Sequence, residues 1–167
     1  MSFTIYQASV PVFLHAFRAL HLILEKAEAS AQTRSIDLSV FFNARLAPDM
    51  LPLVKQVQIA SDTAKAACAQ LAGVAIPSWP DDENSFDDLK ARIAKTIAFL
   101  EGLDQAAFAG AEDRKIAQKV GGAEREFTGA DYLLKRQVPN FFFHITTAYD
   151  ILRHNGVDIG KRDYLAL

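Results

Sequence analysis

Cysteine is almost absent from this sequence, because Cys68 is the only one in 167 residues. A lone cysteine excludes a disulfide within the chain and any metal site built from several thiolates. Such sparse use of cysteine is typical of a reducing compartment, so we expect a cytoplasmic protein. The residues near Cys68 at helical spacing, Ala64 and Leu71, are apolar. We therefore interpret Cys68 as a buried structural thiol and not as a nucleophile.

A surplus of basic residues is also lacking. The chain has 18 Lys and Arg against 20 Asp and Glu, for a formal net charge of -2, and its cations are scattered. Proteins that bind nucleic acid or acidic membranes through charge carry a basic excess, so we expect neither partner. Long apolar runs are missing too, and Gln7, Ser9 and Pro11 interrupt the N-terminal segment. We expect neither a membrane span nor a signal peptide.

What the chain does have is enough length and apolar content for a full-sized core. Half of its residues are hydrophobic and 23% are charged, as in an ordinary globular protein. No internal repeat or low-complexity segment divides it. We therefore expect a single domain over residues 1–167.

Apolar residues recur at spacings of three and four along four segments, which predicts four amphipathic helices. We expect these helices at about residues 4–31, 48–71, 85–101 and 128–155. Thr4 and Gln7 have capping-box spacing, and Gly73 suits the end of the second helix. Four long helices with short connections predict an all-α fold, a four-helix bundle.

Prolines and glycines add local detail to this fold. Pro11 either kinks the first helix or marks its true start, and Pro139 is expected to kink the last helix near Arg136. The Gly121-Gly122 pair favours a small hairpin between the third and fourth helices. A short helical turn is expected around Phe41 and Phe42. The tail that follows Gly156 is predicted to be irregular and to pack back on the helices.

The stretch "VPNFFFHITTAYDILRHNG", residues 138–156, is the densest in the chain. Both sides of this helix are largely apolar, so we expect it to be buried around most of its circumference, with His144 inside. A buried imidazole must be hydrogen-bonded, coordinated to a metal or kept neutral at some cost. A lone histidine in an aromatic helix is more often a hydrogen-bonded core residue than a ligand, and both interpretations stay open here.

Motifs that would identify a reaction are missing. The segment "QKVGGAERE" lacks the Lys-Ser/Thr pair of a phosphate-binding loop, and no Glu-x-x-His motif for a di-iron site occurs. Ser61 and Asp62 have no histidine partner at a defensible spacing. The residues alone therefore do not decide whether the protein is an enzyme.

The order of helices and two long segments resemble the DinB/YfiT-like superfamily. The segments are "APDMLPLVKQVQIASDTAKAACAQLAG" and "FTGADYLLKRQVPNFFFHITTAYDILRHNGVDIGKRDYL". They look closest to a branch of uncharacterised proteins with a "PNFFFH…TAY.ILR" fourth helix. The resemblance implies a four-helix bundle. In the wider superfamily it also implies a divalent metal, often zinc or nickel, held by three histidines, and in some members the transfer or isomerisation of thiol adducts.

The three ligand positions of that superfamily fall here on Gln56, Asn140 and His144, so one histidine of the three remains. Zinc and nickel draw their affinity from imidazole or thiolate. Neutral amide oxygens suit calcium or magnesium only when carboxylates add charge. The resemblance therefore implies a degenerate metal site. As an alternative, the three side chains hydrogen-bond one another across the bundle and satisfy the imidazole without a metal.

Three functional hypotheses follow from these residues and this resemblance. The first is a binding module for a small molecule or a partner, with a degenerate metal site. The second is a divalent-metal or thiol-dependent transferase with an altered ligand set. The third is a structural homodimer that buries exposed helix faces against a twofold mate.

Overall fold

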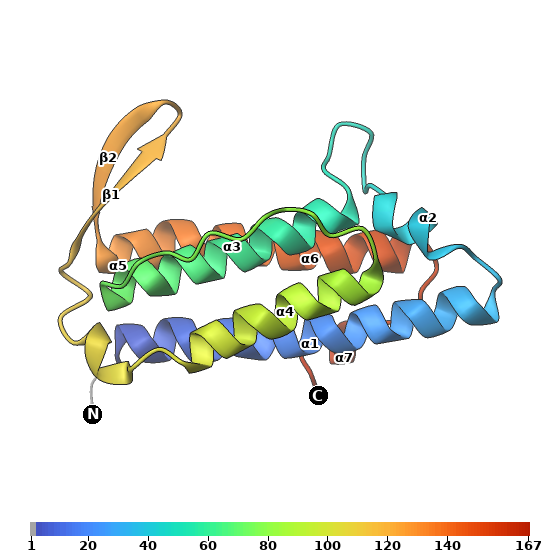
Figure 1. Cartoon of the computed structure of the whole chain (residues 1–167), viewed down its shortest axis with the longest axis horizontal. Helices are drawn as coiled ribbons and strands as arrows, with labels where there is room; N and C mark the ends of the chain where they lie inside the picture. Colours follow the sequence, from blue (N-terminus) through green and yellow to red (C-terminus); the bar gives the residue numbers. More distant parts are fainter. Residues whose placement is uncertain (1–2) are drawn as a thin grey trace.

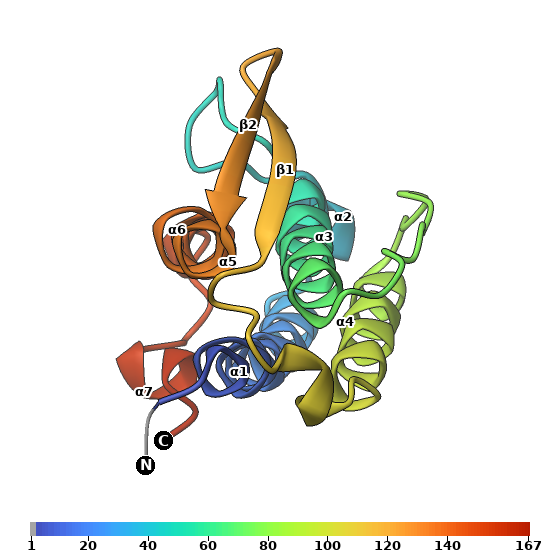
Figure 2. The same ribbon diagram turned by 90° about the vertical axis from the view of Figure 1, so that its left-hand side faces the viewer.

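The computed structural model describes residues 3–167, and within them four long helices lie side by side (Figures 1 and 2). These helices are α1 (Ile5–Thr33), α3 (Leu53–Ala72), α4 (Phe86–Glu101) and α6 (Val138–His154). The shorter helices are α2 (Leu38–Asn43), α5 (Gly129–Asp131), α7 (Lys161–Tyr164) and the 3-10 turn Gln105–Phe108. The fold is mostly helical, as predicted, and carries one small two-stranded sheet.

The core lies between the long helices and is filled by aromatic and small residues. The ring of Phe141 on α6 meets Phe13 and Phe17 of α1 edge to face, at centroid distances of 4.6 and 5.2 Å. Edge-to-face pairs at this separation stabilise a core beyond the area they bury. On α3, the fully buried Ala60 and Ala64 leave room for neighbouring helices to approach closely.

Helix α1 begins at Ile5, after a complete capping box. The Thr4 hydroxyl accepts a hydrogen bond from the Gln7 amide at 3.2 Å, and Gln7 Oε1 accepts one from the Thr4 amide at 3.0 Å. The helix runs through Pro11, so the prediction that Pro11 marks the helix start is wrong. Pro11 is the seventh residue of this helix, so its missing N–H removes one backbone hydrogen bond, the one that would reach the Gln7 carbonyl.

Helix α1 is also the one described helix that is long and apolar enough to cross a membrane by length and composition. Half of its most apolar window is buried inside the fold. A mostly buried core helix of a soluble protein passes the same test, so this feature is weak support for a membrane span.

Helix α3 starts later than its apolar pattern predicted. It begins at Leu53, with Pro52 in the capping position and Pro48 in the preceding loop. Inside a helix Pro52 could not donate to the carbonyl four residues earlier, so the helix starts after the second proline. Its end is as predicted, because Gly73 takes the left-handed conformation with φ of 70°.

The predicted hairpin is confirmed, so the fold is not purely α. Strands β1 (Lys115–Val120) and β2 (Ala123–Thr128) pair antiparallel across Gly121 and Gly122. Both glycines have positive φ, 59° and 84°, as the mirror-image hairpin turn requires. The hairpin stands out from the helices beside the start of α6 (Figure 1).

The last long helix is interrupted near the predicted kink. Residues 128–155 form α5, a π-helical segment at Tyr132–Gln137, and then α6 with Pro139 in its first turn. Pro139 cannot donate a backbone hydrogen bond, and its ring disfavours regular α-helix in the turn before it. The wider π-helical turn accommodates this and changes the direction of the side chains that it carries.

Two smaller predictions concern the connections. The helical turn around Phe41 and Phe42 is confirmed as α2. The tail was expected to be irregular, but it forms the short helix α7. This tail packs back as predicted, since Ile159 is buried and the Tyr164 ring meets Tyr149 at a centroid distance of 5.6 Å.

The loop over residues 74–84 is tied to α3 and α4 by one buried arginine. Arg92 donates to the Pro80 carbonyl at 3.0 Å, to Glu83 at 2.8 Å and to Asp62 at 3.0 Å. Its side chain is almost fully buried, and its charge is balanced by the mostly buried Glu83 and by the partly exposed Asp62 and Asp81.

Candidate functional site: the cavity between α3 and the start of α6

His144 on α6 is buried and bonded to Gln56 on α3, as one of the sequence alternatives predicted. Gln56 Nε2 donates to the Leu51 carbonyl at 2.8 Å, which leaves Gln56 Oε1 facing His144 Nδ1 at 2.7 Å. A carbonyl oxygen only accepts, so Nδ1 carries the imidazole proton. Burial lowers the pKa of His144, which keeps its ring neutral.

Asn140 does not join this pair. It is exposed, and its Nδ2 donates to Thr63 Oγ1 at 2.9 Å. The prediction that Asn140 bonds with Gln56 and His144 is therefore wrong. Helices α3 and α6 run in opposite directions (Figure 1). Asn140 precedes His144 on α6, so it lies beside a residue that follows Gln56 on α3, and that residue is Thr63.

The donor atoms at these positions do not fit zinc or nickel. Both polar atoms of the Gln56 side chain form hydrogen bonds within the protein, and Asn140 bonds to Thr63. Of the His144 imidazole, Nε2 is the nitrogen that remains for a metal. Across residues 3–167, no group of three or more His, Cys, Asp or Glu side chains could hold a metal ion. Cys68 is fully buried, as predicted, and burial raises the pKa of its thiol. A thiol held in its neutral form is a poor ligand.

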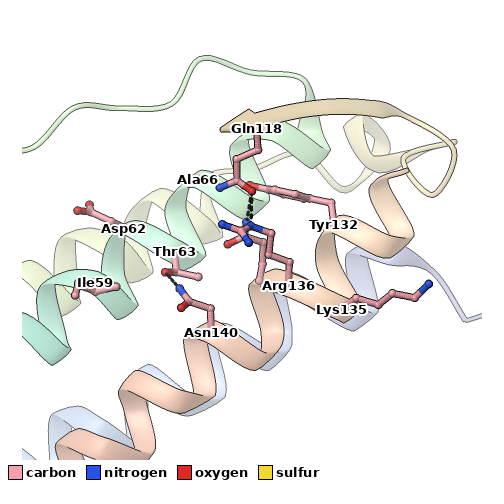
Figure 3. A pocket seen from close by; sticks show the side chains of 10 residues that line it. Ile59, Asp62, Thr63, Ala66, Gln118, Tyr132, Lys135, Arg136 and Asn140 are labelled. Carbon is pink, nitrogen blue, oxygen red and sulfur yellow. Dashed lines mark hydrogen bonds between the residues drawn. The ribbon is translucent and has the colours of Figure 1, made fainter. Parts of the chain in front are cut away.

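Beside Asn140 the structure has a cavity of about 570 Å³ that the sequence did not predict. It lies between α3, the π-helical segment and the hairpin, and Figure 3 shows the side chains around it. Its lining residues are Ile59, Asp62, Thr63, Ala66, Gln118, Tyr132, Lys135, Arg136, Gln137 and Asn140.

Arg136 is the cation at the centre of this cavity. Its Nε donates to Gln118 Oε1 of β1 at 2.6 Å, and Gln137 Nε2 donates to the same oxygen at 3.4 Å. Within residues 3–167, neither terminal nitrogen of Arg136 forms a hydrogen bond to the protein. The side chain is half-buried and points up from the helix toward Gln118 (Figure 3).

The other ionisable groups of the cavity leave this charge unbalanced. Asp62 is paired with Lys65 at 2.7 Å and with Arg92 at 3.0 Å, and its carboxylate lies away from Arg136 (Figure 3). Lys135 also lines the cavity, but its ammonium pairs with Asp131 at 2.9 Å and points away from Arg136 (Figure 3). Burial raises the pKa of Tyr132, so its hydroxyl stays protonated and can donate a hydrogen bond.

Comparison with known proteins shows which family this fold represents. A model of the family described as a domain of unknown function, DUF1993, matches residues 5–165. The chain belongs to the DUF1993 family. The DUF1993 chain is also similar to a solved structure, a DinB family member protein from Shewanella denitrificans, with 42% identity and a TM-score of 0.91. That match covers 96% of this chain and 90% of the other. No curated protein matches.

These matches confirm the resemblance of the DUF1993 chain to DinB-like uncharacterised proteins. The cavity was missed because its lining comes from three separate segments. Two sequence signals did point toward it, the Gly121-Gly122 hairpin and the kink that Pro139 predicts near Arg136. Together they place a strand immediately before an irregular turn of helix, where side chains leave their regular α-helical directions.

Proposed function

We propose that this DUF1993 protein is a small-molecule binding module, built on a four-helix bundle of the DinB type. Its ligand would occupy the cavity between α3 and the π-helical segment. The observation that carries the proposal is the half-buried Arg136, whose terminal nitrogens face a cavity of about 570 Å³ without protein partners among the described residues. That volume lies within the range of about 300–1,000 Å³ for small-molecule sites.

Neutral groups in the same cavity support a ligand that is held by hydrogen bonds. Tyr132, Gln137 and Asn140 bring a hydroxyl and two amides to its wall. A few polar groups that converge on a concave site fix the orientation of a bound molecule. The π-helical turn adds support, because such turns occur frequently at functional sites.

The metal-dependent alternative has less support. Of its three implied ligands, Gln56 and His144 bond to each other and Asn140 bonds to Thr63. Metal analysis of the purified protein separates the two hypotheses. We expect less than stoichiometric zinc or nickel, whereas a stoichiometric metal that is lost on His144→Ala would favour the transferase.

The binding proposal is tested by filling the cavity. Ala66 lines the cavity from α3, so Ala66→Phe would occupy much of its space. Ala29→Phe, on the exposed side of α1, adds the same side chain outside the cavity and serves as the control. Ligand-observed NMR would screen small acids, amides and amines against the wild type and both variants. We expect bound compounds to lose their signal with Ala66→Phe and to keep it with Ala29→Phe.

A screen in which every bound compound still binds Ala66→Phe would contradict the proposal, and so would a screen without any binder. Circular dichroism should first show that both variants keep the helical content of the wild type.

The structural homodimer hypothesis is separate and is tested by light scattering. A mass of 18.4 kDa at every concentration would remove it.

A further inference from the structure

Arg136 has the features of an anion-binding group. Among residues 3–167 no carboxylate lies within ion-pair distance of its guanidinium, although eleven ion pairs of other Lys and Arg side chains occur in the same part of the chain. Arginine stays charged at any ordinary pH. A half-buried charge is costly unless something compensates it. Its protein partner, Gln118, is neutral, and Gln118 Oε1 contacts Arg136 only through the Nε–H donor.

The contact with Gln118 also orients the guanidinium. The Nε contact at 2.6 Å holds one edge of the guanidinium against Gln118 and leaves its two terminal nitrogens for a ligand. Two parallel N–H donors in a rigid fork match the two oxygens of a carboxylate or a phosphate. Gln118 therefore acts as a positioning residue for Arg136.

The hairpin adds a second cation near this site. Gln118 on β1 pairs with Arg125 on β2 in the antiparallel register. Directly opposed residues project from the same face of a hairpin, so Arg125 shares the face of Gln118. Arg125 is exposed and has no ion-pair partner within the described part of the chain. An opening flanked by cations attracts anions from solution.

We infer that the cavity binds a small organic anion, whose carboxylate or phosphate group is held by Arg136. The inference rests on the proposed function, because it names the ligand class of the same cavity. Tyr132 and Gln137, which also line the cavity, are the neutral donors that would complete the shell around the anion. The rest of the ligand would lie along the α3 wall, against Ile59 and Ala66.

Isothermal titration calorimetry would test the inference with three probes: succinate, inorganic phosphate and the neutral analogue succinamide. The decisive variants are Arg136→Gln, which removes the charge, and Gln118→Glu. Gln118→Glu keeps the shape of the hairpin residue and gives Arg136 an internal carboxylate partner. Lys161→Gln on α7 is exposed, removes one positive charge elsewhere and serves as the control.

We expect succinate, phosphate or both to bind the wild type, and succinamide to bind more weakly. Arg136→Gln and Gln118→Glu should each weaken the bound anion by about tenfold to a hundredfold, as the loss of a charged hydrogen-bonding partner does. Lys161→Gln should change the affinity by no more than about twofold, because an exposed remote charge is screened. Succinate binding alone assigns a carboxylate ligand, and phosphate binding alone assigns a phosphate ligand.

Anion binding that is unchanged in Arg136→Gln or in Gln118→Glu would overturn the inference. It would also be overturned if only neutral compounds bind and Ala66→Phe blocks them, while the proposed function would then stand. If every compound that binds the wild type binds Ala66→Phe equally well, both the inference and the proposed function would be contradicted. If Arg136→Gln does not fold, Gln118→Glu decides the question alone, since its side chain lies on the outer hairpin and keeps its hydrogen-bonding geometry.

Discussion

Replacing Gln56 by methionine tests the hydrogen bond that joins α3 to α6. Gln56 and His144 are 1% and 8% exposed, so water cannot easily replace the lost partner of His144 Nδ1. A buried donor left without an acceptor costs about 1–3 kcal/mol. We expect Gln56→Met to lower the free energy of unfolding by that amount. For a domain of this size, each kcal/mol lowers the melting temperature by roughly 2–4 °C.

The double variant Gln56→Met/His144→Leu provides the control for this prediction. Replacing both partners by apolar groups of similar shape is often nearly neutral, so most of the lost stability should return. Urea denaturation of the wild type, the two single variants and the double variant gives the interaction energy by a double-mutant cycle. Strictly additive losses would refute the hydrogen bond, and so would a Gln56→Met protein as stable as the wild type.

Three further predictions concern stability. Burial lowers the pKa of His144 in the folded chain, so the unfolded chain binds the proton more readily. The contribution of the neutral His144 to the free energy of unfolding should be fully present above about pH 6.5 and should be lost as the pH falls below it. Urea titrations at several pH values would measure this decline, and His144→Leu should remove the part of it that comes from His144. Arg92→Leu leaves its carboxylate partners without the buried cation and should cost about 3–5 kcal/mol in the same denaturation assay; a loss below 1 kcal/mol would contradict the account. A Cβ at Gly129 would overlap the Ala111 carbonyl oxygen, so Gly129→Ala should lower the melting temperature clearly, while Gly160→Ala, with open space around it, should leave it nearly unchanged.

Helix ends were the most predictable part of the fold, because their signals are local. Thr4 caps α1 as the sequence indicated, Ser85 and Thr128 cap helices at the predicted starts of the third and fourth segments, and Gly73 ends α3 in the left-handed conformation. A side chain that bonds a backbone amide two or three residues away needs no information from the rest of the chain. The late start of α3 was missed because Pro48 and Pro52 both fit a first turn when each is considered by itself.

The Gln56–His144 pair was one of two open predictions, and it required knowing which residues of the two helices face each other. The resemblance to the DinB/YfiT-like superfamily supplied that information. It did not supply the pairing of Asn140, which depends on how far α3 and α6 are shifted along each other.

The cavity itself was beyond the reach of sequence patterns. Arg136 carries no signal that separates it from any solvated helical arginine. Its role becomes apparent only when the π-helical turn directs it upward and the hairpin brings Gln118 above it. Contacts between segments that are distant in the sequence depend on the whole fold, and local propensity does not encode them.

The most direct test of anion binding in this cavity is an NMR titration of the labelled protein with succinate and with inorganic phosphate, followed through backbone amide shifts. We expect saturable shifts centred on Gln118, Tyr132, Arg136 and Gln137 with at least one of the two anions, and their loss in Ala66→Phe. Shifts that are absent with both anions, or that are scattered over residues outside the cavity, would contradict it.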